Sequence, residues 1–292
     1  MPTSLTKVLI TGATGNVGIA VLKALQKSTH LLHIIAGVRD IKSDSKLLAE
    51  FGVDYVQFDF TDTLTYKSAL QNCEILFLLR PPQITDIQNY FKPLIKAAKD
   101  NHVKHIIFLS VQGVERSRFI PHHKIESLIT ASGIPYTFLR PAYFMQNFST
   151  TLRQELIKNK RIYLPAGNAK FTLVDVTDIG NVTAKILEDI SLHHNKAYEL
   201  TSRIKLSFKE MAQELSRGLG INIAYQSPGL FSFYFAKRKE KLTPSFILVL
   251  IMLHYLPRFQ KEPAVTDCIK VITGIEPLEF DQFISHNKSI LM

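Results

Sequence analysis

Three glycines, Gly12, Gly15 and Gly18, stand at three-residue intervals directly after the apolar run at residues 8–10. The apolar run predicts a buried strand, and the apolar stripe over residues 19–25 predicts a helix behind the glycines. The first glycine allows a tight reversal, the second removes a side chain that would hold a phosphate away from the backbone, and the third allows close packing of helix on strand. The spacing therefore predicts a turn that holds the diphosphate of a dinucleotide.

The start of the predicted helix supplies the groups that bind the diphosphate. The first N–H groups of a helix have no partner within it and attract anions. The alternative is a glycine turn with a purely structural role. Under the binding interpretation, the predicted cofactor-binding residues of the turn are Gly12, Thr14, Gly15, Asn16, Val17 and Gly18.

The end of the second apolar run, residues 34–38, bears on the choice between NADP and NAD. An NAD-binding protein places a carboxylate there, about 20 residues past the glycines, to bind the ribose 2′-hydroxyl. This chain has Val38 and Arg39, and a guanidinium pairs well with a 2′-phosphate, so NADP(H) is predicted, with NAD(H) possible. If Asp40 rather than Arg39 faces the ribose, the preference reverses. The alternative for Arg39 is an ordinary solvated charge.

Apolar runs alternate regularly with helical stretches, which predicts an α/β protein with a doubly wound parallel sheet of Rossmann type. Further strands are expected at residues 55–58, 75–79, 105–109 and 136–139, with helices at 66–71 and 87–99. Pro141 should end the sheet, so a second region begins near Tyr143. That region has short strands at 162–164 and 197–200 and helices at 179–188 and 208–219, the latter opened by a capping box of Ser207 and Glu210. The predicted domains are residues 1–141 and a smaller α/β domain, 142–292, from which the chain can cross back to the sheet near 170–190.

Composition excludes several classes of protein. The chain has 292 residues, is 46% hydrophobic and contains only two cysteines, so we expect neither disorder, a disulfide framework nor a metal site. The amino terminus lacks the pattern of a signal peptide, and a cytoplasmic location is predicted. The net charge of +10 divides evenly between residues 1–150 and 151–292, and no nucleic-acid-binding signature is present, so no nucleic-acid partner is expected.

Residues that follow the other strands are the next candidates, because ligands of open parallel sheets bind beyond the carboxyl ends of the strands. Asp59 is a candidate acceptor for the adenine amino group, with a helix cap or turn residue as the alternative. Leu79 and Arg80 are expected beside the middle of the cofactor, and Arg80 has the alternative of a solvated charge. Ser110 is expected near the nicotinamide.

The chain resembles the NmrA-like family of atypical short-chain dehydrogenase/reductases. The resemblance rests, in order along the chain, on the glycine turn, the Val38-Arg39 strand end, Ser110-Val111-Gln112-Gly113, His123-Lys124-Ile125-Glu126, Leu139-Arg140-Pro141, Phe144-Met145-Gln146-Asn147, Asp175-Val176-Thr177-Asp178-Ile179 and Thr273-Gly274-Ile275-Glu276-Pro277. It covers nearly the whole chain. It implies an NADP-binding amino-terminal domain, a small carboxy-terminal substrate domain and a cleft between them.

The chain departs from the wider group at its catalytic pair. That group uses a tyrosine four residues before a lysine, the phenol acting as acid. Here Lys124 occupies the place of the lysine and Ile120 that of the tyrosine. Lys124 is therefore predicted to bind the nicotinamide ribose, and His123 is the candidate for proton transfer, with a surface or supporting role as the alternative for the histidines at 122 and 123. Tyr143 is a candidate for the substrate side of the cofactor.

The resemblance implies that members without this tyrosine reduce quinones or activated double bonds, or bind the cofactor as redox sensors. The main prediction is an NADP(H)-dependent oxidoreductase that transfers hydride to a quinone-like acceptor, a small molecule. The alternatives are a non-catalytic cofactor sensor and, less favoured, a nucleotide-sugar epimerase or dehydratase. The apolar run at 246–253 is too short to cross a bilayer. It predicts first a buried helix over the substrate cleft, second a subunit interface, as in a homodimer, and third a membrane-surface contact.

Overall fold

The computed structural model describes residues 5–28, 32–116 and 118–292, which form two compact units. The first unit combines the chain up to Pro141 with Val176–Leu200 and Cys268–Ile275. The second unit combines Ala142–Asp175, Thr201–Asp267 and Glu276–Met292. Each unit is thus assembled from segments that are far apart in the sequence.

The first unit is built on a sheet of seven parallel strands in the order β10-β6-β5-β4-β1-β2-β3. The strands are β1 Thr6–Thr11, β2 Leu32–Val38, β3 Asp54–Gln57, β4 Ile75–Leu79, β5 His105–Leu109, β6 Tyr136–Pro141 and β10 Lys196–Leu200. From β1 the chain adds β2 and β3 toward one edge of the sheet, and β4, β5, β6 and β10 then follow toward the other edge. The predicted doubly wound, Rossmann-type sheet is confirmed, with its switch point between β1 and β4.

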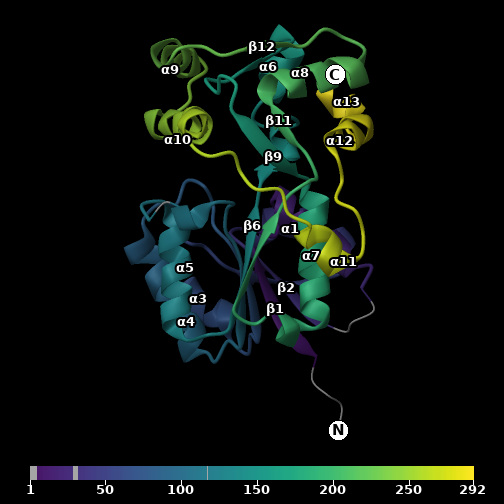
Figure 1. The fold of residues 1–292 in the computed structure, drawn as a ribbon. Coiled ribbons are helices and arrows are strands. Elements are labelled where there is room, and N and C mark those ends of the chain that lie inside the picture. Colours follow the sequence, from purple (N-terminus) through teal and green to yellow (C-terminus); the bar gives the residue numbers. More distant parts are fainter. Residues whose placement is uncertain (1–4, 29–31, 117) are drawn as a thin grey trace. The chain divides into compact units, whose positions relative to one another are not determined.

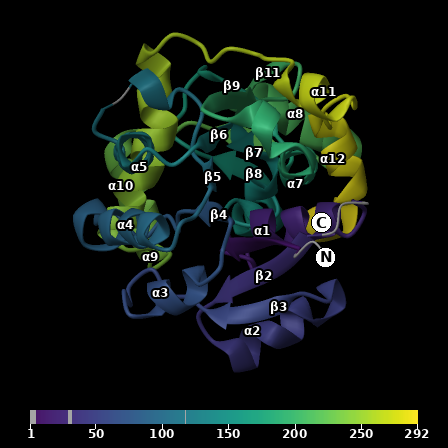
Figure 2. The same ribbon diagram turned by 90° about the horizontal axis from the view of Figure 1, so that it is seen from below.

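Helices cover both faces of this sheet, which is why its inner strands are apolar throughout. Figure 1 shows α3, α4 and α5 on one face and α1, α7 and α11 on the other, and Figure 2 shows the same layers from below. The helices are α1 Asn16–Leu25, α2 Ile41–Leu48, α3 Thr65–Leu70, α4 Lys92–Asp100, α5 Pro121–Ser132, α7 Val176–Glu188 and α11 Cys268–Thr273. Shorter turns are η1 Ala49–Phe51, the π-helical η2 Ile87–Phe91, η3 Val114–Arg116 and η5 Ile190–His193.

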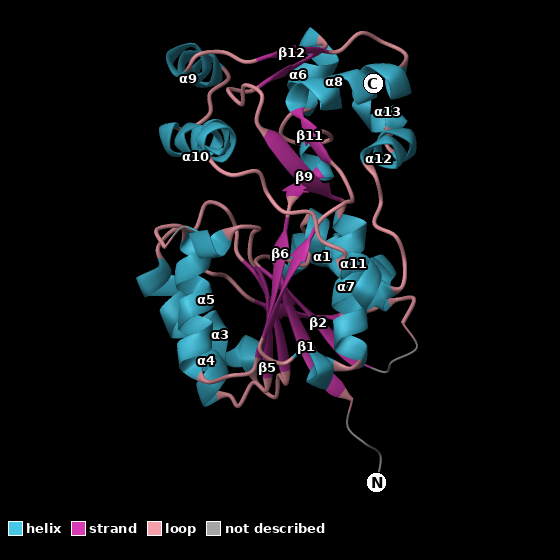
Figure 3. Cartoon of the chain, in the orientation of Figure 1, coloured by secondary structure: helices cyan, strands magenta, loops and turns pink. Residues whose placement is uncertain are grey.

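The second unit has two small sheets and its own core (Figure 3). One sheet has the order β11-β9-β7 and the other pairs β12 with β8. The strands are β7 Tyr143–Phe144, β8 Arg161–Tyr163, β9 Lys170–Val174, β11 Lys205–Ser207 and β12 Ala224–Gln226. The helices are α6 Arg153–Asn159, α8 Phe208–Leu219, α9 Leu230–Lys239, α10 Pro244–Tyr255, α12 Phe280–His286 and α13 Lys288–Leu291, with the turns η4 Met145–Asn147 and η6 Leu256–Phe259. Buried aromatic rings, among them Phe148 and Phe208, fill the core.

Several local expectations are confirmed and others corrected. The capping box of Ser207 and Glu210 opens α8 as predicted. The strand expected over 136–139 runs to Pro141, because at this last position the strand needs only the proline carbonyl, which accepts a hydrogen bond of 3.0 Å from the backbone N–H of Gln112. The strand expected at 197–200 belongs to the main sheet, as β10 beside β6, and not to the second unit.

The apolar run at 246–253 forms most of α10, and it is buried on one face only. Ile247, Leu250 and His254 face the core of the second unit. Leu248 is 59% exposed and Leu253 is 45% exposed, so the expectation of a fully buried helix is wrong for this face. Within the described part of the chain, no helix has the length and apolar character needed to cross a bilayer.

Candidate functional site

The glycine turn joins β1 to α1 with the geometry that the spacing predicts. Gly12 has a φ of +63°, a left-handed conformation that favours glycine. A Cβ atom at Gly18 would lie 2.3 Å from the Gly12 carbonyl oxygen, so only glycine lets the helix approach this closely. Gly15 is exposed at the N-cap of α1, and its carbonyl accepts the helix's first hydrogen bond, 2.9 Å from the Ile19 nitrogen.

The N–H groups of the first turn of α1 lie at the start of this helix, where they have no partner within it. Asn16 is exposed and Thr14 half-buried, whereas the side chain of Val17 packs inward. The helix carries no acidic residue in this turn to compete with an anion. The geometry of the turn therefore suits a phosphate group.

The turn lies at the switch point of the sheet, where β1 and β4 are neighbours. Thr11, which the sequence interpretation missed, ties the two strands together: its buried hydroxyl donates to the Phe77 carbonyl (3.1 Å) and accepts from the Leu79 N–H (2.9 Å). The Leu79 side chain comes within 3.1 Å of the point where a Cβ of Gly12 would lie. Leu79 thus lies beside the glycine turn, and the contact of Leu79 and Arg80 with the cofactor stays a prediction.

Arg39 and Asp40 follow β2 and have different surroundings. Asp40 is the N-cap of α2, and its carboxylate accepts a hydrogen bond of 2.9 Å from the Lys42 N–H. Arg39 is exposed, and within the described ranges no residue forms a hydrogen bond or ion pair with its guanidinium. Of the two side chains, the guanidinium is therefore the one available to a ligand.

Asp59, the candidate adenine partner, holds a local turn. Its Oδ1 accepts hydrogen bonds from the Thr61 N–H (2.7 Å) and hydroxyl (2.8 Å). Its own N–H donates to the Thr65 hydroxyl at 3.1 Å. This arrangement matches the alternative of a turn residue, and a contact with adenine stays a prediction.

Arg80 is tethered to the loop that follows β4. Its Nη1 donates to the carbonyls of Pro81 (3.1 Å), Pro82 (3.2 Å) and Ile84 (2.8 Å), and its Nε donates to Nε2 of His122 at 3.5 Å. Burial lowers the pKa of Arg80 to about 10. The alternative of a freely solvated charge is therefore wrong.

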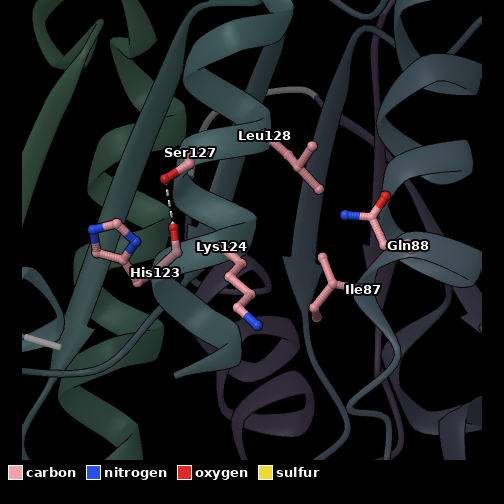
Figure 4. Close-up of a pocket in the computed structure, with 6 residues that line it drawn as sticks. All are labelled: Ile87, Gln88, His123, Lys124, Ser127 and Leu128. Atoms are coloured by element: carbon pink, nitrogen blue, oxygen red, sulfur yellow. Dashed lines mark hydrogen bonds between the residues drawn. The ribbon is translucent and has the colours of Figure 1, made fainter. Parts of the chain in front are cut away.

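Lys124 and His123 lie on α5, where they line a pocket of about 250 Å³ together with Ile87, Gln88, Ser127 and Leu128. Figure 4 shows the Lys124 side chain extending toward Ile87, whereas the imidazole of His123 extends in another direction. The His123 carbonyl accepts a hydrogen bond of 2.9 Å from the Ser127 hydroxyl. The pocket lies between α5 and η2, and the roles predicted for Lys124 and His123 stay predictions.

Two tyrosines bear on the epimerase alternative, which needs a phenol beside the nicotinamide. Tyr136 begins β6 and is therefore at the amino edge of the sheet, where it stacks on Phe138. The Tyr143 hydroxyl, in the second unit, lies 3.2 Å from Nε2 of His254, and burial raises the pKa of this phenol. Neither arrangement favours an acid for this chemistry, and a cofactor contact of Tyr143 stays a prediction.

Two structural devices of the first unit were not assigned from the sequence. The buried Glu126 and the largely buried Arg140 form an ion pair with bonds of 3.1 and 2.8 Å, which ties α5 to β6. Gly180 of α7 packs on α1 so closely that a Cβ would lie 2.4 Å from the Ala20 carbonyl oxygen. Neither contact can be predicted without knowing which helices and strands are neighbours.

The parallel sheet, its strand order and the glycine turn at the switch point define a Rossmann-type α/β protein. The family model described as "NmrA-like family" matches residues 4–233, and the chain belongs to this family. Three relatives span most of the chain. Prestalk A differentiation protein A of Dictyostelium discoideum is 28% identical (94% of this chain, 90% of the relative), and Quinone oxidoreductase 2 of Escherichia coli is 29% identical (75% and 77%). NAD(P)H azoreductase of Xenophilus azovorans is 28% identical (94% and 96%).

Solved structures share the fold. Triphenylmethane reductase of Citrobacter has a TM-score of 0.84 at 24% identity, with coverage of 97% of this chain and 99% of that protein. The NADPH-dependent quinone oxidoreductase of Escherichia coli, complexed with NADPH, has a TM-score of 0.83 at 24% identity (96% and 99%). The negative transcriptional regulator NmrA, in complex with NAD, has a TM-score of 0.78 at 16% identity (99% and 97%). At these identities the comparisons show the fold alone.

Proposed function

We propose that this protein is an NADP(H)-dependent oxidoreductase that reduces a quinone-like or other conjugated acceptor. The observation that carries the proposal is the glycine turn: Gly12 in a left-handed conformation, Gly15 at the N-cap and Gly18 against the turn leave the backbone bare where a diphosphate would bind. Arg39, exposed at the end of β2, fits a 2′-phosphate, while Asp40 is engaged in capping. NAD(H) is the alternative cofactor for the same site.

When bound, the cofactor supplies a hydride at its nicotinamide. The chain's own residues orient it: the glycine turn holds the diphosphate, Arg39 the ribose phosphate, and Lys124 the nicotinamide ribose. Ile120, in the place of the tyrosine acid, cannot transfer a proton, so an acceptor whose reduced oxygen is protonated by water is favoured over an alcohol or a sugar. The relatives and fold neighbours named as quinone, azo-dye and triphenylmethane reductases support this choice.

The test is consumption of NADPH by the purified protein with a panel of quinones, followed by the absorbance of the reduced cofactor at a fixed low protein concentration. We expect turnover with at least one quinone, none without protein, and a strong reduction in Gly18→Val, whose side chain would meet the turn. A matched control is Gly52→Val, because a Cβ at Gly52 meets nothing within 4 Å, although its φ of +62° costs some stability. Absence of turnover with every acceptor would refute the reductase assignment.

The second candidate is a cofactor sensor without turnover. The isoleucine at position 120 favours it, as does the shared fold with the NmrA regulator. This function predicts tight binding that differs between NADP and NADPH, together with no quinone reduction. The assay above and a titration with both cofactor forms separate the two candidates. A homodimer and a cytoplasmic location stay predictions, which size-exclusion chromatography and cell fractionation would test.

A further inference from the structure

Arg80, Ser110 and His122 share one face of the sheet at its carboxyl edge. Side chains alternate along a strand, so Arg80 continues the side of Leu78 and Ser110 continues the side of Phe108. Leu78 and Phe108 both belong to the core on the side of α3, α4 and α5. The register pairs the residues just before them, Leu79 with Leu109, so Arg80 and Ser110 follow directly after the ends of two neighbouring strands. His122 of α5 lies over the Phe108 ring, with 6.1 Å between centroids, and contacts Arg80.

Arg80 is a partly buried cation without a counter-charge among the described residues. Its hydrogen-bond partners are three backbone carbonyls and His122, and in the described part of the chain no carboxylate pairs with it. Its Nη2 donates to no described residue. A partly desolvated guanidinium that lacks a carboxylate partner is stabilised by a ligand that brings an electron-rich oxygen.

His122 and Ser110 add two donors. Nε2 of His122 accepts from Arg80, which assigns the imidazole proton to Nδ1. Burial and the Arg80 charge lower the pKa of His122 to about 3, so at pH 7 the ring is neutral and donates only through Nδ1. Ser110 is 4% exposed, and its hydroxyl has no hydrogen-bond partner among the described residues.

We propose that Arg80, Ser110 and His122 form a binding site for an anionic or electron-rich oxygen, and that its ligand is the acceptor's carbonyl oxygen. The assignment to the acceptor rests on the proposed function. As the acceptor receives a hydride from the reduced cofactor, the electrons of its π system move onto this oxygen, which then takes a proton from water. The three donors stabilise the negative charge while it exists. Neutral His122 is a hydrogen-bond donor in this step and not the acid.

The experiment uses the full chain without cofactor and the coloured anion of 2-hydroxy-1,4-naphthoquinone, with neutral 1,4-naphthoquinone as the matched probe, in equilibrium dialysis at pH 7. We expect Ser110→Ala and Arg80→Met each to weaken binding of the anion, the latter by about 10-fold or more, with less than about a twofold change for the neutral quinone. Ser110→Ala removes no described hydrogen bond, so it tests the site without loss of fold. Arg116→Met, an exposed arginine in η3, is the control and should change neither affinity.

A second arm titrates NADPH against the same variants, because a cofactor phosphate offers the same chemistry. Arg80 and Ser110 are also predicted from the sequence to lie beside the cofactor, so this arm decides between the two roles. If their ligand is the acceptor, the NADPH affinity of each variant should stay within about twofold of wild type. Unchanged binding of the anion in both variants, or a loss confined to NADPH, overturns the proposal. Failure of the proposed function appears separately, as absence of NADPH consumption by wild-type protein with neutral quinones, because the dialysis needs no turnover.

Discussion

Replacing Arg39 by alanine should weaken the binding of NADPH but not that of NADH. Arg39 is exposed and pairs with no described residue, and the N-cap of α2 is supplied by Asp40, so the substitution leaves the local structure intact. A hydrogen bond to a charged group contributes about 1.5–3 kcal/mol, which corresponds to roughly 10- to 100-fold in Kd. Because this guanidinium is open to solvent, we expect the lower half of that range, about 10- to 30-fold, and a smaller effect at high salt.

Isothermal titration calorimetry with NADPH and NADH measures this directly. The NADH affinity of Arg39→Ala should stay within about twofold of wild type, since NADH lacks the 2′-phosphate. Asp40→Asn is the paired variant: asparagine preserves the cap, and it should leave NADH binding unchanged if the Asp40 carboxylate only caps α2. Equal weakening of both cofactors in Arg39→Ala, no weakening of either, or loss of NADH affinity in Asp40→Asn would refute the reasoning.

Three further predictions concern stability. Gly18→Ala should lower the free energy of unfolding by about 1–3 kcal/mol in urea, because its Cβ meets the Gly12 carbonyl at 2.3 Å, whereas Gly15→Ala, at 3.3 Å, should cost less; equal losses would contradict the close-packing role. Glu126→Ala should cost about 3 kcal/mol, because the largely buried Arg140 guanidinium loses both hydrogen bonds to Glu126 and keeps only the 3.5 Å ion pair with Glu115. Glu115→Ala removes only that longer, more exposed pair and should cost less than about 1 kcal/mol, again from urea unfolding; similar values would show that the Glu126 pair is not special. Burial, reinforced by two neighbouring histidines, lowers the pKa of His105 to about 3. Between that value and the unfolded value of about 6.5, the unfolded chain binds the proton more strongly, so stability falls as the pH falls, by about 3 kcal/mol from pH 7 to pH 4 for this group. The unfolding free energy of His105→Gln should therefore depend less steeply on pH than that of wild type, and an identical slope would contradict the prediction.

The main sheet could be predicted because its strands are buried on both faces. The run at 75–79 is apolar throughout and the run at 105–109 is apolar after His105, and they match β4 and β5 residue for residue. The short strands β9 and β11 of the second unit were missed. β9 mixes polar and apolar residues within its five positions, and the three residues of β11 carry too little periodicity to be recognised. The prediction that residues 197–200 belong to the second region was also wrong, because the pairing of β10 with β6 joins residues that are 59 positions apart and leaves no local signal.

Three tertiary contacts of the first unit could not be predicted for the same reason. Glu126 and Arg140 are 14 residues apart on different elements, so only the packing of α5 against the sheet brings them together. From the sequence Gly180 is an ordinary helical glycine, and only the packing of α7 against α1 shows that a side chain does not fit there. From the sequence Thr11 is a polar residue at a strand end, and only the pairing of β1 with β4 gives its hydroxyl the two hydrogen bonds that join these strands.

The chain's local chemistry by itself determined the order of strands and helices and the bare turn between β1 and α1, because glycine conformation and apolar periodicity act over a few neighbouring residues. Only the tertiary structure decided which of two adjacent histidines meets Arg80. Ile125 and Ile129 pack α5 against the sheet, and this sets the rotation of the helix that turns His122 inward and leaves Lys124 exposed. A helix's rotation about its own axis depends on what it packs against, which residue spacing alone does not contain.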